Sequence, residues 1–428
     1  MEFESMMGPG LPLMRLTGLW QMGRQGGGVS RGLRLATIVL SVLLVVAGST
    51  LHLVFDTPDQ FEDITLCGFN IDIVSLDLLK GVLFVVQGAP LRELVQLLCD
   101  ARAGFTFADI NHAIRGRYEA VADRMRILLQ ATVVLPLVGW LSAPLMSRLA
   151  AGAGGSRAPR QLPVPAWLPV DIHATPTYEL LYALQAFGCT AAGAFSICVD
   201  AFFIRLMLLI SAEIEVLCEN ISAIGVPHPA QGSGGCICRC QPNAADLACT
   251  CKGCVKAFTS SPEEASDEMY QLLVKAVRHH QTIIRMVALL QQTMDALVFI
   301  VLFANMANLC CSLFATAILL QRGGSLTKTL KGLSAVPVVL YQTSLYCLFG
   351  HIVTDQSEKL YNAAISCGWV NCDARFKRSL LIFMVEAMKP LEITVGKFCK
   401  LSRQMLLQVF HSSYALMNLL YYYHYNTE

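Results

Sequence analysis

The last apolar stretch of the chain carries polar side chains at helical spacing. Within residues 401–428, "LSRQMLLQVFHSSYALMNLLYYYHYNTE", Gln404, Gln408, His411 and Asn418 recur at intervals of 4, 3 and 7 residues. These intervals place the four side chains on one face of a helix. Amide and imidazole groups cost free energy in hydrocarbon unless they face water or bond to a neighbouring helix. The stripe therefore predicts a helix with one hydrated or partnered face.

A second group of side chains that could bind a ligand lies in the middle of the chain. Residues 225–262 are rich in Gly, Pro and Ser, and their cysteines follow the pattern C-x-C-x-C-x8-C-x-C-x2-C. Clustered cysteines in a reducing compartment indicate metal binding, and four thiolates would complete one Zn²⁺ site. Palmitoylated cysteines, free cysteines in a disordered loop and a translated intron remain alternatives. The candidates are Cys236, Cys238, Cys240, Cys249, Cys251 and Cys254.

The sequence favours no enzyme class. It contains no H-E-x-x-H or G-x-x-x-x-G-K-S/T pattern, and its one G-x-S-x-G match, at residues 28–32 (GVSRG), lies in the glycine-rich N-terminal stretch. The adjacent His279 and His280 lie in a polar helical stretch, where such a pair is more often solvated or packed than a ligand site. The net charge of +1 argues against a general nucleic-acid role. We therefore expect neither an enzyme nor a nucleic-acid-binding protein, and no cofactor.

The composition indicates a membrane protein. Of the 428 residues, 54% are hydrophobic and 15% are charged, whereas soluble domains carry roughly 25% charged residues. A membrane-spanning helix needs about 20 apolar residues. Asp72, Asp77 and Lys80 interrupt the second of the candidate spans, and the polar stripe lies in the last. The seven candidate spans are 33–55, 64–87, 127–149, 178–210, 291–320, 330–354 and 400–424.

The distribution of basic residues predicts the orientation of these spans. If the N-terminus is cytoplasmic, 26 of the 32 Lys and Arg residues fall on the cytoplasmic side. Cytoplasmic loops carry such an excess, so we expect the N-terminus inside and the C-terminus outside. The single glycosylation sequon, Asn220-Ile221-Ser222, then lies in the cytoplasm and should be unused.

The cytoplasmic connections are themselves helical in pattern. Residues 88–126, 264–290 and 373–390 repeat apolar side chains at helical spacing with charges between them. They predict helices that extend from the membrane and pack as a second layer. Pro390 ends one of these helices, and Gly396 is a plausible turn position before the last span. The expected fold is all-α, with a tail at 1–32, a seven-helix bundle at 33–424 and the cysteine-rich insertion at 225–262.

Several stretches resemble insect odorant receptors of the seven-helix, inverted-topology class. They are "LPVPAWLPVDIHATPTYELLYALQAF" (162–187), "VDAFFIRLMLLISAEIEVL" (199–217), "HHQTIIRMVALLQ" (279–291) and residues 360–420, with the elements W…C…R…L…KPL…GKF…LS…F…SSY…LL. The resemblance covers nearly the whole chain except 1–30 and 225–262. The C-terminus is similar to the tuning receptors rather than to the co-receptor. The final-helix signature of gustatory receptors is not found.

The resemblance implies a subunit of a ligand-gated, non-selective cation channel. Such a subunit would form a heterotetramer with the odorant co-receptor in the cell membrane of olfactory neuron dendrites and would bind a small volatile odorant. Its last helix would line the pore, where a narrow apolar ring near Met417 and Tyr421 excludes water. Interhelical hydrogen bonding remains the alternative role for the polar stripe. The pore candidates are Ser413, Tyr414, Met417, Asn418 and Tyr421.

The resemblance also places the ligand site in the outer half of the bundle, between the second, third, fourth and sixth spans. An apolar and aromatic pocket there suits a weakly polar volatile. The candidate residues are Ile71, Ile73, Val74, Ser75, Leu135, Gly139, Trp140, Tyr178, Tyr182, Gln185 and Tyr341. A co-receptor-like or gustatory-type subunit, or a transporter or assembly subunit without ligand gating, remains an alternative. A transporter should show helix breaks in both halves, and the break found lies near 390–397.

Overall fold

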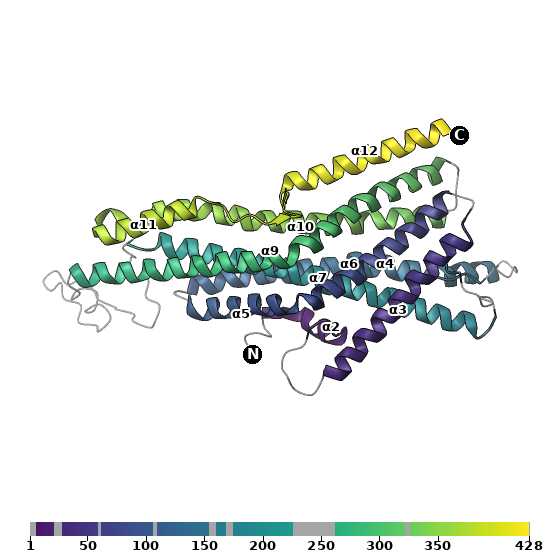
Figure 1. Ribbon diagram of the computed structural model, residues 1–428, viewed down its shortest axis with the longest axis horizontal. Coiled ribbons are helices and arrows are strands. Elements are labelled where there is room, and N and C mark those ends of the chain that lie inside the picture. The colour runs from purple at the N-terminus through teal and green to yellow at the C-terminus, as the bar shows by residue number, and fades with distance from the viewer. Residues whose placement is uncertain are drawn as a thin grey trace, which may run out of the picture.

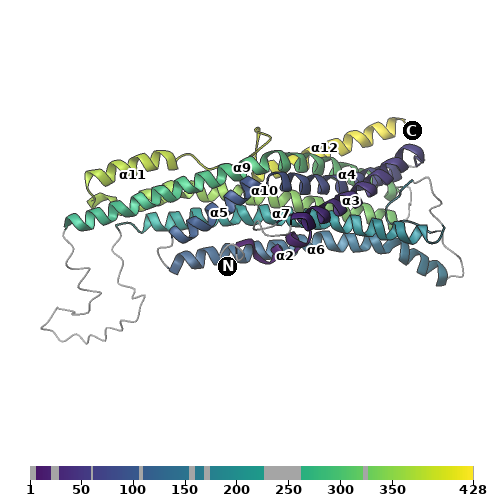
Figure 2. The same cartoon turned by 60° about the horizontal axis from the view of Figure 1, so that its bottom comes forward.

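The protein is an elongated helical bundle in the computed structural model (Figures 1 and 2). The structure describes residues 6–20, 28–58, 61–105, 109–153, 160–167, 174–225, 262–321 and 326–427. In chain order the elements are η1 (Gly8–Gly10), α2 (Leu11–Leu16), α3 (Gly28–Phe55), α4 (Phe61–Val86), α5 (Gly88–Gly104), α6 (Asp109–Ala153), α7 (Thr177–Ser222), α9 (Pro262–Gln321), α10 (Leu326–Ser366), η2 (Trp369–Asn371), α11 (Ala374–Ala387), β1 (Thr394–Val395), β2 (Cys399–Lys400) and α12 (Arg403–Thr427). The prediction of an all-α fold is confirmed.

Five of the described helices are long and apolar enough to cross a bilayer. They comprise Val29–Phe55, Ile110–Leu149, Thr177–Ser222, Ser266–Gln321 and Gly332–Ser366. The remaining two predicted spans coincide with α4 and α12. Charged residues interrupt the apolar stretch of α4, and amide, imidazole and phenol groups make α12 less apolar. Each predicted span thus falls on one long helix.

Several helices continue beyond their predicted spans, as the periodicity indicates. The additional turns of α6, α7, α9 and α10 pack with α5 and α11 at one end of the molecule, and α3, α4 and α12 occupy the other end (Figure 1). One hydrophobic cluster runs through both parts. The two layers therefore form a single bundle.

Helix α7 is the centre of this bundle. Nearly every side chain between Phe195 and Leu217 is buried, and α7 packs against α3, α4, α6, α9 and α10. A helix that is apolar on all sides is stable only when neighbours surround it. The few polar residues of α7 consequently need partners inside the protein.

The N-terminal segment is more ordered than a tail. The sequence predicted a tail at 1–32, but residues 6–20 pack into the bundle, and Met6, Met7, Met14 and Trp20 are buried. The Trp20 ring lies 5.6 Å from that of Phe202. Apolar side chains spaced over a short helix can fill a gap against α7, and this contact depends on tertiary structure rather than on a long periodic pattern.

The predicted break before the last helix is a small hairpin. Strands β1 and β2 pair antiparallel, with Thr394 opposite Lys400. Gly396 and Lys397 both have positive φ angles, 61° and 63°, which is the backbone of a tight hairpin turn. The side chain of Gln291 in α9 holds the hairpin because its Oε1 accepts from Thr394 N at 2.7 Å and its Nε2 donates to Thr394 O. Gly396 is thus a turn, as predicted.

The predicted metal site in the cysteine-rich segment lies outside the described residues. This holds for Cys236, Cys238, Cys240, Cys249, Cys251 and Cys254. Within the described part of the chain, no group of three or more His, Cys, Asp or Glu side chains is arranged to hold a metal ion.

Candidate ligand pocket and pore helix

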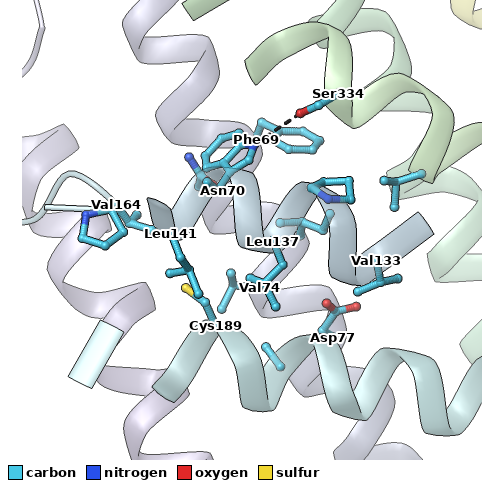
Figure 3. Close-up of a pocket in the computed structure, with 17 residues that line it drawn as sticks. Phe69, Asn70, Val74, Asp77, Val133, Leu137, Leu141, Val164, Cys189 and Ser334 are labelled. Atoms are coloured by element: carbon cyan, nitrogen blue, oxygen red, sulfur yellow. Dashed lines mark hydrogen bonds between the residues drawn. The ribbon is translucent and has the colours of Figure 1, made fainter. Parts of the chain in front are cut away.

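An apolar cavity of about 120 Å³ lies between α4, α6, α7 and α10 (Figure 3). These are the helices that contain the second, third, fourth and sixth predicted spans. The lining residues are Phe69, Asn70, Ile73, Val74, Asp77, Val133, Pro136, Leu137, Trp140, Leu141, Pro163, Val164, Cys189, Ala192, Gly193, Ser334 and Val338.

Helical spacing accounts for the composition of the walls. On α4 the lining residues run from Phe69 to Asp77 along one face, and on α6 they run from Val133 to Leu141. Gly193 of α7 adds space because a Cβ atom there would lie 3.3 Å from Val133 Cγ1. A larger side chain at Gly193 would project into the cavity.

Three of the predicted ligand residues bond to the segments around the cavity instead of lining it: Gln185 and Tyr178 bond to the loop at 160–167, and Tyr182 bonds to α6. Gln185 accepts a hydrogen bond from Val164 N at 3.2 Å and donates one to Val164 O at 2.9 Å. Tyr178 donates to Gln161 O at 3.0 Å, and Tyr182 donates to Leu141 O. Because Val164 and Leu141 line the cavity, these polar side chains position its walls.

The other predicted ligand residues divide between the cavity and the rest of the bundle. Ile73, Val74 and Trp140 line it, and the Trp140 indole donates to Ser334 Oγ at 3.3 Å. Ile71, Ser75 and Tyr341 are not among the lining residues, and the Tyr341 hydroxyl lies 3.9 Å from Met125 Sδ.

Two further predicted ligand residues, Leu135 and Gly139, also do not line the cavity. Leu135 is 72% exposed, and a Cβ atom at Gly139 would meet nothing within 4 Å. The predicted ligand residues did not include several lining residues that lie one or two turns from Val74 and Trp140 on the same helices. Asn70 and Asp77 could have been found from that spacing.

A network of buried polar side chains, here called the Lys80 network, lies beside the cavity. Lys80 Nζ is 2.8 Å from Ser196 Oγ and 3.3 Å from both Asp77 Oδ1 and Asp200 Oδ2. Asp200 also accepts from the Tyr346 hydroxyl at 2.6 Å and from Gln342 Nε2. Asn305 Nδ2 donates to Gln342 Oε1 at 3.0 Å and so extends the network to α9. The network joins α4, α7, α9 and α10.

A second buried polar cluster stabilises the layer at the other end of the bundle. Glu213, which is fully buried, accepts two hydrogen bonds from Arg115, at 2.9 and 2.8 Å. His279 Nε2 lies 3.3 Å from Glu213 Oε2, and the His279 ring stacks on Phe105. His280 packs edge-on against Phe383. Both histidines therefore have packing roles, one of the two alternatives to a ligand site.

The last helix, α12, lies at the edge of the bundle and packs on α9 and α10 (Figure 1). Ser413 is buried there and donates to Val409 O at 2.8 Å and to Met306 O at 3.3 Å. All four residues of the polar stripe, Gln404, Gln408, His411 and Asn418, are exposed. The polar face of α12 thus turns away from the other helices of its own chain.

The remaining pore candidates differ in exposure. Tyr414 is 61% exposed, whereas Met417 is half-buried. Tyr421 is 36% exposed, and its hydroxyl accepts a hydrogen bond from Gln321 Nε2 at 2.7 Å. A face that contains Tyr414, Asn418 and Tyr421 is therefore free to meet water or another subunit.

Comparison with known proteins identifies the family. The family model described as 7tm Odorant receptor matches residues 72–414. Odorant receptor 2a of Drosophila melanogaster is 23% identical over 265 residues, which cover 62% of this chain and 60% of that protein. Odorant receptor Or1 of Anopheles gambiae is 22% identical over 302 residues, which cover 69% and 66%. The match thus spans about 60% of the length of the first of these relatives.

The fold has solved counterparts. The insect olfactory receptor OR5 from Machilis hrabei, in complex with eugenol, superposes with a TM-score of 0.75 over 98% of both chains, at 13% sequence identity. A second structure of the same receptor gives a TM-score of 0.70 over 96% of both chains, at 16% identity. Together with the family match over most of its length, this shows that the chain is a multi-pass membrane protein of the seven-transmembrane odorant receptor family.

Proposed function

We propose that this chain is the odorant-binding subunit of a ligand-gated, non-selective cation channel. It is a tuning receptor that assembles with the odorant co-receptor as a heterotetramer, in the cell membrane of olfactory neuron dendrites. The observation that carries the proposal is an apolar cavity between four helices that a buried polar network connects to the helix supporting α12. A receptor needs both parts, a ligand site and a physical connection from it to the gate.

The walls of the cavity support a small volatile as the ligand. Trp140 and Phe69 supply aromatic surface, and most other lining residues are aliphatic. Apolar pockets with a few placed polar groups are typical of small-molecule sites. The OR5 relative was solved with eugenol, a small volatile, so a panel of small phenols, esters, alcohols and amines is a suitable first set of probes.

A continuous set of contacts supports coupling between the cavity and the last helix. Asp77 lines the cavity and pairs with Lys80, which contacts Asp200. Asp200 is bonded to Gln342, and Gln342 to Asn305 of α9. The next residue of α9, Met306, accepts a hydrogen bond from Ser413 of α12. A ligand that fits one arrangement of these helices better shifts the population toward that arrangement.

In the assembled channel, α12 supplies the pore wall. Met417 and Tyr421 form the apolar ring that excludes water in the closed state, with Ser413, Tyr414 and Asn418 beside it. The exposure of the polar stripe supports this role, since polar groups on a membrane helix need water or a partner. The ring opens when the supporting helices rearrange.

The N-terminus is cytoplasmic and the C-terminus extracellular in this proposal, because most basic residues fall on the side of the N-terminus. An epitope tag at the C-terminus should be stained on intact cells. Staining that requires permeabilisation would contradict this orientation.

The ligand pocket is tested by a pair of matched glycine substitutions. Gly193→Leu places an isobutyl group in the cavity, whereas Gly139→Leu, on the exposed face of α6, leaves the cavity unchanged. On co-expression with the co-receptor, Gly193→Leu should abolish or strongly reduce odorant-evoked current at normal surface level, and Gly139→Leu should retain it. Equal responses of the two variants would contradict the assignment of the pocket.

A further inference from the structure

One of the residues that line the cavity, Asp77, is acidic. Asp77 belongs to both the cavity wall and the Lys80 network. Its side chain keeps 13% of its surface exposed, whereas those of Lys80 and Asp200 keep 2% and 1%. Figure 3 shows the Asp77 carboxylate at one side of the group of lining residues, with Asn70 on the opposite side. Asp77 is therefore the point at which the network reaches the cavity.

The charges of the Lys80 network do not balance. Two carboxylates, Asp77 and Asp200, share the single ammonium of Lys80, at 3.3 Å each. The Asp200 carboxylate is further stabilised by hydrogen bonds from Ser196, Gln342 and Tyr346. Among the described residues that line the cavity, none is Lys, Arg or His. The excess negative charge consequently resides on Asp77, at the surface of the cavity.

An excess charge inside a membrane protein is costly and usually has a function. A cation in the cavity removes that cost, because a charge-assisted hydrogen bond in a site of low dielectric constant is about twice as strong as a neutral one. We propose that the ligand of this receptor is a small protonated amine, whose ammonium group pairs with Asp77 while its apolar body fills the cavity. This inference rests on the proposed function, since it specifies the ligand of the same pocket.

The size of the cavity limits the ligand. A dry cavity of about 150 Å³ accepts benzene, so the 120 Å³ found here accommodates a body of about five or six carbon atoms. The apolar walls suit an aliphatic chain, and the polar end must lie at Asp77. Carboxylic acids are disfavoured because their charge has the same sign as that of Asp77.

A second polar side chain in the wall agrees with a ligand that donates hydrogen bonds. Asn70 is 8% exposed and lies seven residues before Asp77, about 10 Å along the same face of α4. Its Nδ2 donates to Leu66 O at 2.9 Å, which fixes the orientation of the amide. Within the described part of the chain, Asn70 Oδ1 accepts no hydrogen bond. The cavity wall thus provides two acceptor groups, one of them charged.

The test compares three ligands of nearly equal shape: isopentylamine, isopentanol and 2-methylpentane. Receptor and co-receptor are expressed together, and the concentration for half-maximal current is measured for each ligand. The variant is Asp77→Asn, which keeps Lys80 paired with Asp200. The matched control is Asp72→Asn on the same helix, an exposed carboxylate outside the cavity lining that accepts from Asn308 Nδ2 at 2.7 Å.

In the wild type, isopentylamine should act at a lower concentration than isopentanol and 2-methylpentane. Asp77→Asn should raise the half-maximal concentration of the amine by at least about tenfold more than that of the alcohol, as expected for a lost charge-assisted bond. Weaker coupling through the Lys80 network would shift both ligands alike, so the difference between them reports the amine contact. Asp72→Asn should shift the two alike or not at all. A neutral ligand as potent as the amine in the wild type, or an equal shift of both ligands in Asp77→Asn, would overturn the proposal.

A binding measurement separates this inference from the proposed function. If none of the small volatiles tested evokes current, the proposed channel function fails. The purified complex is then heated with each ligand: stabilisation by isopentylamine that is lost in Asp77→Asn but kept in Asp72→Asn supports the amine site, and stabilisation independent of Asp77 overturns it. If neutral volatiles evoke current and the amine does not, the channel function stands and the amine site is wrong.

Discussion

Helices α7 and α12 both coincide with predicted spans, but other helices surround them to very different degrees. Helix α7 is enclosed by five other helices, and its side chains from Phe195 to Leu217 are almost all buried. Helix α12 packs through one side only and leaves many large apolar side chains uncovered. These include Leu407, Tyr414, Leu419, Tyr422 and Tyr423.

Their polar residues differ in the same way. Asp200 and Glu213 of α7 are each bound by several donors from neighbouring helices. On α12, by contrast, Gln404, Gln408 and Asn418 are exposed. Polar groups in α7 are completed within the chain, and those in α12 depend on water or on another subunit. The comparison indicates that the stability of the chain depends mainly on α7, whereas the exposed polar face of α12 fits the pore role proposed for it.

The largest effect is expected from a substitution in the buried interior of α7. Asp200→Ala removes the acceptor of Lys80, Tyr346 and Gln342, so that the buried Tyr346 hydroxyl and Gln342 amide lose their partner while Lys80 keeps Asp77. Each buried polar group left without a partner costs about 1–3 kcal/mol, so we expect a large fall in the unfolding temperature of the purified receptor. Asn418→Ala on α12 is the control and should change stability by no more than about 0.5 kcal/mol. Similar unfolding temperatures for the two variants would contradict the claim that α7 contributes more to stability than α12.

The next effect concerns gating and leaves stability unchanged. Met417→Ser on α12 should increase the resting current, because a more polar ring lowers the barrier that excludes water from a narrow pore. Asn418→Asp should alter ion selectivity, since a ring of like charges acts directly on permeant ions. Both are measured by recording currents without odorant and in different salts. The pore assignment is wrong if these variants are silent and Tyr182→Ala changes resting current and selectivity instead.

A smaller effect tests the outer end of α7. Gln185→Ala removes two hydrogen bonds to Val164 and should release the loop that covers the cavity. Two neutral hydrogen bonds contribute about 1–2 kcal/mol, so the odorant concentration for half-maximal current should rise by about tenfold. Resting current should stay the same. A change in resting current with unchanged odorant sensitivity would place Gln185 in gating rather than in the pocket.

The smallest effect is expected from the cysteine-rich insertion between α7 and α9. It interrupts a chain that otherwise resembles its family, so deletion of residues 228–258 should leave odorant-evoked currents largely intact. Surface expression and current are measured for the deleted and full-length chains. Loss of assembly on deletion, together with Zn²⁺-dependent rescue in a series of single cysteine substitutions, would indicate a structural metal instead.

Much of the architecture follows from local sequence. The seven long helices, the extension of α6 and α9 beyond their spans, the helix at 373–390 and the turn at Gly396 were predicted, whereas the additional turns of α7 and α10 were not. Length and periodicity of apolar runs, together with Gly and Pro, encode these features within a few turns of chain. The odorant receptor family and the absence of an enzymatic role were also predicted, and the family match confirms both.

The residues of the ligand pocket depended on information that is not local. Leu135 and Gly139 face outward, Tyr178 and Gln185 hold the loop at 160–167, and Tyr182 bonds to α6 rather than lining the cavity. In a soluble helix the apolar stripe shows which side faces the core. In a membrane the lipid-facing and core-facing sides are both apolar, so the sequence does not report the rotation of a helix about its axis.

For the buried polar groups, too, the sequence shows which residues are polar, and only the tertiary structure shows their partners. Sequence alone showed that Asp77 and Lys80 interrupt a membrane span, and it showed that His279 and His280 are adjacent. Only the packing of α4 against α7 brings Lys80 to Asp200, 120 residues away, and only the packing of α9 against α7 brings His279 to Glu213. Partners this distant in sequence are selected by the angles and offsets at which helices cross, and these depend on all the side chains at the contact.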